Sequence, residues 1–168
     1  YNLPGAFFAS ATVQGVLSGD VLVAEGGFLF VSEKDEQGLR RIARYTPDLV
    51  RQNTVTVDPN AVGNITDGFG RGGFLYTVND GGNTSPGAKL IKYDLNLNEV
   101  ARATVSFGAQ HANGNGIVVT PNGEVIAAVT SGSTVKLVKY SGSLAPISES
   151  DVSGLFASDA EDLDLAFA

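Results

Sequence analysis

The only histidine in the chain, His111, lies in a glycine-rich segment that could carry chemistry. The segment reads Phe-Gly-Ala-Gln-His-Ala-Asn-Gly-Asn-Gly over residues 107–116. An imidazole can act as a general base or bind a ligand near neutral pH, and Asp67 or Asp80 could orient it. The alternative is a histidine on an exposed loop without a role, and only the geometry of the folded chain decides between them.

A dense acidic run near the end of the chain offers hard oxygen ligands, which Ca²⁺ prefers. The candidate metal ligands there are Asp159, Glu161 and Asp162. Their spacing does not match the alternating Asp and Asn positions and distant Glu of a helix-loop-helix calcium loop. A solvated acidic segment is the alternative, so we expect no obligatory cofactor, with Ca²⁺ as the one candidate.

Other catalytic signatures are missing from the sequence. No Gly-x-Ser-x-Gly segment is present, and the glycine-rich residues 68–73 lack the Lys-Ser/Thr and helix that follow in a phosphate-binding loop. We interpret residues 68–73 as a flexible loop before a strand. The absence of cysteine removes disulfides and thiolate metal sites. The residues therefore favour a protein that is not an enzyme.

Size and charge limit the partners. A chain of 168 residues is one domain's worth, and a net charge of −7 repels phosphate backbones and anionic membrane surfaces. No uninterrupted apolar stretch approaches the ~20 residues that cross a bilayer. Because no methionine precedes Tyr1, we expect a fragment or a mature form after removal of a secretory leader. The expected location is extracellular, at the cell surface or periplasmic.

A repeat in the sequence indicates which structural elements would position these candidate residues. An apolar pair runs into a basic residue and a tyrosine three times, and Tyr45, Tyr93 and Tyr140 are 48 and then 47 residues apart. A fixed period of this length, built from strand-like segments, is typical of a radial β architecture. We expect the basic residue before each tyrosine to pack its stem against the core while its head reaches water.

Short runs rich in Val, Thr, Ile and aromatics alternate with Gly, Asn, Asp and Pro clusters, which predicts short antiparallel strands. Aligned on the tyrosines, the runs form four-strand units at about 20–58, 62–107 and 114–152. Two further strands, 7–13 and 162–167, lie outside these units. We therefore expect a single all-β domain over residues 1–168, with an irregular β-sandwich as the alternative fold.

Two segments resemble the blades of NHL-type, lactonase-type and quinoprotein-like β-propellers: Asn-Gly-Ile-Val-Val-Thr-Pro-Asn-Gly at 115–123 and Lys-Leu-Ile-Lys-Tyr-Asp at 89–94. The resemblance covers about residues 20–168 and implies a propeller-like array of four-stranded antiparallel blades, as an incomplete ring or a fragment. It also implies that the loop after a second strand and the connection between blades share a face that commonly holds the ligand. The expected ligand-binding residues on that face are Asn79, Asp80, Asn83, His111 and Asn113.

Asn115, followed by Gly116 and a Pro-Asn-Gly turn, is similar to the segment of calcium-dependent gluconolactonases in which the Asn ligates the metal. Only Asn115 matches that pattern here. An Asn in a turn ahead of a strand is the alternative explanation.

Two function hypotheses result. The first is a non-enzymatic exported protein that binds other protein chains or assembles with itself into a homo-oligomer or filament, because strands outside the units leave open edges. The second is a calcium-dependent lactonase-like hydrolase, or a fragment of one, with a metal near Asn115 and a base at His111. Neither a nucleic-acid partner nor insertion into a membrane is expected.

Overall fold

The computed structural model describes residues 16–57, 62–82 and 85–155, which form three four-stranded antiparallel sheets. Sheet 1 contains β1 (Val16–Glu25), β2 (Phe28–Asp35), β3 (Arg40–Tyr45) and β4 (Arg51–Val57). Sheet 2 contains β5 (Val62–Arg71), β6 (Phe74–Gly81), β7 (Ala88–Asp94) and β8 (Glu99–Val105). Sheet 3 contains β9 (Asn113–Val119), β10 (Val125–Ser131), β11 (Thr134–Tyr140) and β12 (Pro146–Asp151), followed by the 3₁₀ turn η1 (Ser153–Leu155).

In each sheet the strands pair in chain order, so the expected four-strand units are confirmed. The further strands expected at 7–13 and 162–167 lie outside the described residues. Within the described residues, no helix is long and apolar enough to span a bilayer.

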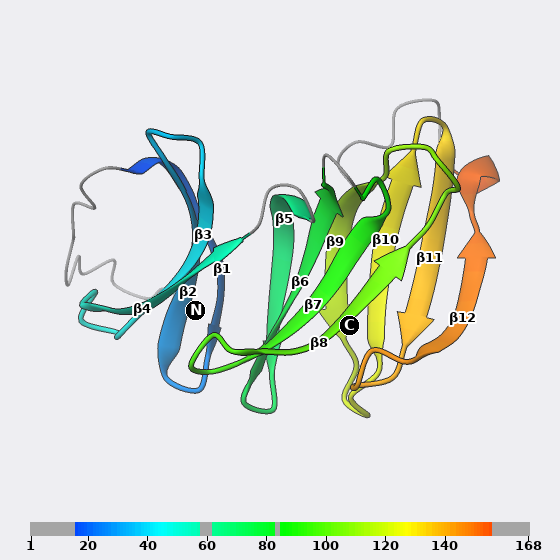
Figure 1. The fold of residues 1–168 in the computed structure, drawn as a ribbon. Coiled ribbons are helices and arrows are strands. Elements are labelled where there is room, and N and C mark those ends of the chain that lie inside the picture. Colours follow the sequence, from blue (N-terminus) through cyan, green and yellow to red (C-terminus); the bar gives the residue numbers. More distant parts are fainter. Residues whose placement is uncertain (1–15, 58–61, 83–84, 156–168) are drawn as a thin grey trace, which may run out of the picture.

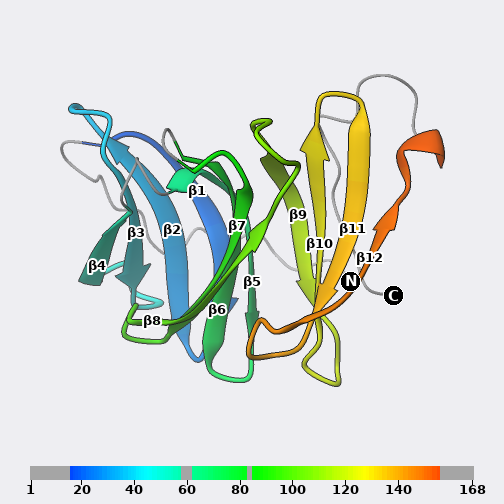
Figure 2. The same ribbon diagram turned by 45° about the vertical axis from the view of Figure 1, so that its right-hand side comes forward.

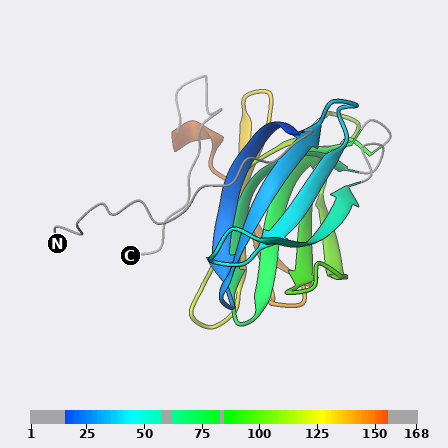
Figure 3. The ribbon, with the colours of Figure 1, turned by 90° about the vertical axis from the view of Figure 1, so that its left-hand side faces the viewer.

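The sheets stack face to face with their first strands adjacent, as Figures 1 and 3 show. β1 contacts β5, and β5 contacts β9. Because successive side chains on a strand point to opposite faces, sheet 2 supplies two separate cores. Leu75 and Ile91 join Phe30 of sheet 1, whereas Val78 and Leu90 join residues of sheet 3.

The three repeat tyrosines occupy equivalent places. Each is the last or next-to-last residue of the third strand of its sheet, is at most 8% exposed, and lies opposite the first residue of the fourth strand after a register shift. The sequence period therefore marks structurally equivalent sheets.

A leucine at positive φ recurs four residues after each tyrosine. Leu49, Leu97 and Leu144 have φ angles of 61°, 65° and 60°, and each donates its N–H to the carbonyl of the residue directly after the tyrosine. Positive φ is uncommon for a side chain of this size, but Leu97 and Leu144 are only 3% and 5% exposed, so burial offsets the strain. The fourth strand of each sheet begins two residues after this leucine, at Arg51, Glu99 and Pro146.

Residues 68–73 are not a flexible loop. β5 continues to Arg71, and Gly72-Gly73, with φ of 64° and 80°, forms the tight turn into β6. A Cβ at Gly70 would lie 2.5 Å from the Cβ of Glu25 in sheet 1. The glycine there permits close approach of β5 to β1, a requirement that the sequence pattern does not reveal.

Candidate functional site

The loop after β6 and the connection between β8 and β9 meet at the top of sheets 2 and 3 in Figures 1 and 2. Gly81 N donates to Ala112 O at 2.8 Å, and Ala112 N donates to Pro86 O at 2.8 Å. The His111 ring donates from Nε2 to Gly81 O at 2.9 Å, because a carbonyl can only accept. The two loops that the resemblance places on one face therefore lie together, and Nδ1 of a neutral His111 is left as the acceptor nitrogen.

Asp80 connects three strands below this junction. It is 9% exposed and accepts hydrogen bonds from Asn64 Nδ2 at 2.9 Å and Gly114 N at 3.2 Å. Burial raises the pKa of the Asp80 carboxyl, while these hydrogen bonds and the charges of His111 and Arg40 act against the rise. No hydrogen bond between Asp80 and His111 is formed, so the charge of Asp80 acts on the imidazole only at a distance.

Asn79 and Asp80 are adjacent in the sequence, but their side chains do not belong to the same site. As successive residues of β6 they face opposite sides of sheet 2. Asn79 is fully buried; its Oδ1 accepts from Thr77 Oγ1 at 2.8 Å, and its Nδ2 has no hydrogen-bond partner.

Lys89, opposite Asn79 on β7, is a buried cation that the sequence pattern did not single out. It is 3% exposed and donates to Ser85 Oγ at 2.8 Å and Gly87 O at 2.7 Å. Burial, and to a lesser extent the charge of Arg102, lowers the pKa of the Lys89 ammonium. A lysine inside the apolar run 88–91 was the available sequence signal.

The other candidates are more dispersed. Asn113 is exposed on β9, and Asn115 Oδ1 accepts from Thr130 Oγ1 at 3.0 Å. Asn83, Asp159, Glu161 and Asp162 lie outside the described residues. Among the residues that the structure describes, no group of three or more His, Cys, Asp and Glu side chains is placed to hold a metal ion.

A second arrangement, not expected from the sequence, joins the sheets through the basic residues of the repeat. Arg44 Nη1 donates to Leu95 O of sheet 2 at 2.6 Å, and its guanidinium lies 4.4 Å from the centroid of the Phe28 ring. Lys92 Nζ donates to Gly142 O of sheet 3 at 2.8 Å and lies 3.8 Å from the Phe74 centroid. We call Arg44 and Lys92 the cross-sheet cations.

The two cross-sheet contacts are equivalent. Each donor directly precedes a repeat tyrosine, each acceptor lies two residues after the tyrosine of the next sheet, and each ring belongs to the first residue of the second strand. Arg44 and Lys92 are half-buried, and the head of each does more than reach water: it donates to a carbonyl of the adjacent sheet and lies against an aromatic ring of its own sheet.

The third copy differs. Lys139 occupies the donor position in sheet 3, and Glu124 replaces the phenylalanine. The two side chains form an ion pair at 2.8 Å and are 35% and 34% exposed.

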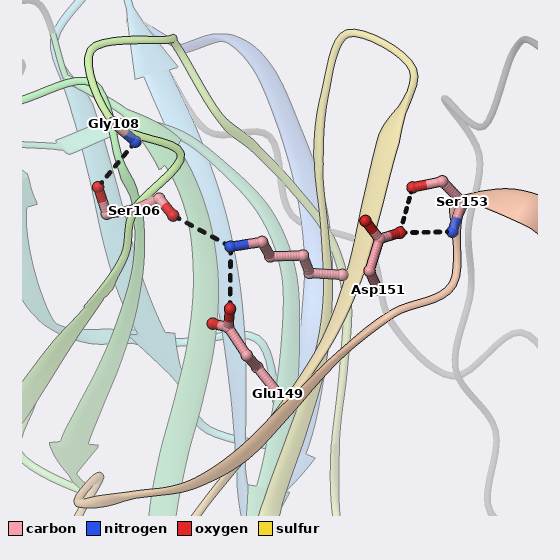
Figure 4. Close-up of polar contacts among 6 residues, drawn as sticks. Ser106, Gly108, Glu149, Asp151 and Ser153 are labelled. Atoms are coloured by element: carbon pink, nitrogen blue, oxygen red, sulfur yellow. Dashed lines mark hydrogen bonds and ion pairs between the residues drawn. The ribbon is translucent and has the colours of Figure 1, made fainter.

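The outer rim between sheets 2 and 3 carries a further contact, drawn in Figure 4. Lys136 Nζ donates to Glu149 Oε1 at 3.0 Å and more weakly to Ser106 O at 3.4 Å, and lies 4.6 Å from the Phe107 centroid. Asp151 accepts from Ser153 N at 2.9 Å and from its hydroxyl, which lowers the pKa of the Asp151 carboxyl.

The buried tyrosines predict a loss of stability in alkali. Burial raises the pKa of Tyr93 and of Tyr45 to about 12, and it also raises the pKa of Tyr140. A phenol whose folded pKa exceeds the ordinary value of about 10 favours the fold below pH 10, and this contribution disappears between about pH 10 and 12. We expect the free energy of unfolding, measured by urea titration with circular dichroism, to fall across that range.

A Tyr93→Phe variant should lose less stability over the same range, because it has no phenol to ionise at that position. The absorbance of tyrosinate, recorded in parallel, should show fewer groups titrating late. Identical alkaline slopes for parent and variant would contradict the assignment.

No family model matches the sequence, and no curated protein matches it. Among the solved structures that are similar are the following two. One is a subtype N11 neuraminidase-like protein of the A/flat-faced bat/Peru strain, at TM-score 0.54 and 14% identity, over 73% of this chain and 35% of that chain. The other is a europium-containing methanol dehydrogenase, at TM-score 0.57 and 10% identity, over 81% of this chain and 27% of that chain.

At these identities the likeness concerns the fold alone. Together with the three stacked four-stranded sheets, it confirms the propeller-like array of antiparallel blades rather than the irregular sandwich. The chain spans about a third of the length of the neuraminidase-like protein and about a quarter of that of the dehydrogenase.

Proposed function

We propose that these propeller blades belong to an exported, non-enzymatic protein that assembles with other protein chains, and that the partner is a second copy of the same chain. Sheet 3 of one copy would dock on sheet 1 of the next, continuing the stacking of sheets that each chain contains.

The basic residues that precede the three repeat tyrosines are the main support for this proposal. Two basic residues of the repeat reach the turn of the following sheet, whereas the third, Lys139, pairs with Glu124 of its own sheet. In sheets 2 and 3 the accepting carbonyl lies in the turn between the third and fourth strands. The same turn of sheet 1 contains Pro47, two residues after Tyr45. A donor position at one end and an acceptor position at the other are complementary, which favours a head-to-tail contact between copies.

Charge supports the same pairing. Asp48, next to Pro47, is exposed, so the turn offers a carboxylate as well as a carbonyl to an incoming ammonium. In the assembled state Lys139 would donate to Pro47 O as Lys92 donates to Gly142 O. Val50 is 55% exposed beside this turn, and the same contact would shield its apolar surface from water.

Charge reversal tests the proposal. The parent chain should show a mass above that of one chain by size-exclusion chromatography with light scattering, rising with concentration. Lys139→Glu and Asp48→Lys should each shift the equilibrium to the monomer, because each places like charges across the contact.

A 1:1 mixture of the two variants should recover the oligomer, since every interface then pairs residue 139 of one sign with residue 48 of the other. Lys34→Glu, on β2 away from both positions, is the matched control and should leave the parent's mass unchanged. A monomeric parent at all concentrations, or an oligomer insensitive to Lys139→Glu, would refute the proposal.

The lactonase-like alternative stays a prediction. Asn115 and His111 each use a polar atom on a partner within the chain, and no described contact favours a metal or a substrate at either residue.

A further inference from the structure

A groove of about 620 Å³ opens between sheets 2 and 3 at the end opposite the loop junction. Phe74 and Tyr76 supply aromatic surface to it, and the turn at 121–123 with Gly142 forms the wall from sheet 3. Two turns that line it, the one between β5 and β6 and the one between β9 and β10, lie at the bottom of Figure 1.

The corresponding place between sheets 1 and 2 is filled. Leu95, two residues after Tyr93, packs against the core that these sheets share. Its Cδ1 lies 2.6 Å from the position of a Cβ added to Gly26, in the turn between β1 and β2.

Between sheets 2 and 3 the equivalent of Leu95 is Gly142, and the equivalent of Gly26 is Gly72. A Cβ added to Gly72 would meet nothing within 4 Å. The groove is therefore the space that a leucine side chain occupies at the preceding interface.

The charge of the groove also differs from that of the filled interface. Glu25, which precedes the Gly26 turn, accepts from Gly73 N at 2.8 Å. Its equivalent is Arg71, which lines the groove and donates through Nη1 to Val119 O. Lys92 lines the groove as well, and the lining contains no carboxylate.

We propose that this groove binds a branched aliphatic carboxylate, with a leucine-sized alkyl group over Gly72 and the carboxylate at Arg71 and Lys92. Each cation uses one donor on a backbone carbonyl, and an arginine and a lysine have further N–H groups for an anion. In a chain of net charge −7, two cations on one apolar hollow select an anionic ligand. The inference does not depend on self-assembly.

Titration with N-acetyl-L-leucine and with 4-methylpentanoate, followed by amide NMR shifts, tests the site. The amides of Gly72, Gly123 and Gly142 should shift with saturation, while that of Gly154 should not. Acetate, which lacks the alkyl group, and 4-methylpentanamide, which lacks the charge, should bind at least about 10-fold more weakly. A tripeptide ending in leucine, as free acid and as amide, tells whether a chain end can supply the same chemistry.

Two variants complete the test. Arg71→Gln should weaken binding about 10-fold, and Arg102→Gln, on the outer strand β8, should not. Gly142→Leu should abolish binding by restoring the leucine, although its Cβ would lie 2.9 Å from Gly123 O and the turn must shift. Equal affinity for the acid and its amide, unchanged binding in Arg71→Gln, or no shifts at millimolar ligand would overturn the proposal, whether or not Gly142→Leu folds.

Discussion

A Gly81→Ala variant should lose at least about 3 kcal/mol of unfolding free energy, because the new methyl group has no room. Its Cβ would lie 1.9 Å from Pro86 O and 2.4 Å from Pro86 C, and backbone atoms cannot rotate away as a side chain can. Gly81 also donates to Ala112 O and accepts from His111, so any shift disturbs the whole loop junction. Urea denaturation followed by circular dichroism measures the effect.

Gly154→Ala is the matched control. Nothing lies within 4 Å of a Cβ added there, and its φ is not in the positive range, so stability should change by no more than about 0.5 kcal/mol. If Gly81→Ala stayed within about 1 kcal/mol of the parent, the two loops would be far more yielding than their hydrogen bonds indicate.

Replacing Lys92 by alanine should cost about 2–3 kcal/mol, since its ammonium makes one contact that joins sheet 2 to sheet 3 and a second contact with an aromatic ring of its own sheet. The variant leaves Gly142 O without its charged donor and removes the cation from the face of Phe74. The same urea titration, carried out at low protein concentration, reports the loss within one chain.

Lys139→Ala is the internal comparison, because Lys139 holds the same repeat position in sheet 3. Its ion pair with Glu124 is about one-third exposed on both sides, and such pairs contribute about 0–1 kcal/mol. Equal losses for the two variants would mean that the cross-sheet contacts of Lys92 add nothing to stability.

The comparison of Lys92 with Lys139 also shows how far the candidate sites could be foreseen. The repeat of a basic residue before each tyrosine is visible in the sequence, but the acceptor of Lys92 lies 50 residues away. Likewise, the loops carrying Gly81 and His111 could be expected to meet. Asn79 and Asp80 face opposite sides of the sheet because β6 extends to Gly81, so that both residues lie in the strand and not in the loop after it.

Local patterning by itself determined the all-β character, the four-strand units and the equivalence of the three tyrosines, because strand alternation and turn chemistry are written over a few residues and repeat with the period. Only the tertiary structure decided which basic heads bind the neighbouring sheet, why Gly70 is a glycine within a strand, and that a groove lies beside Gly142 where Leu95 fills the equivalent place. These features arise between sheets, from side chains about fifty positions apart, and the free energy of such contacts depends on packing that no short segment encodes.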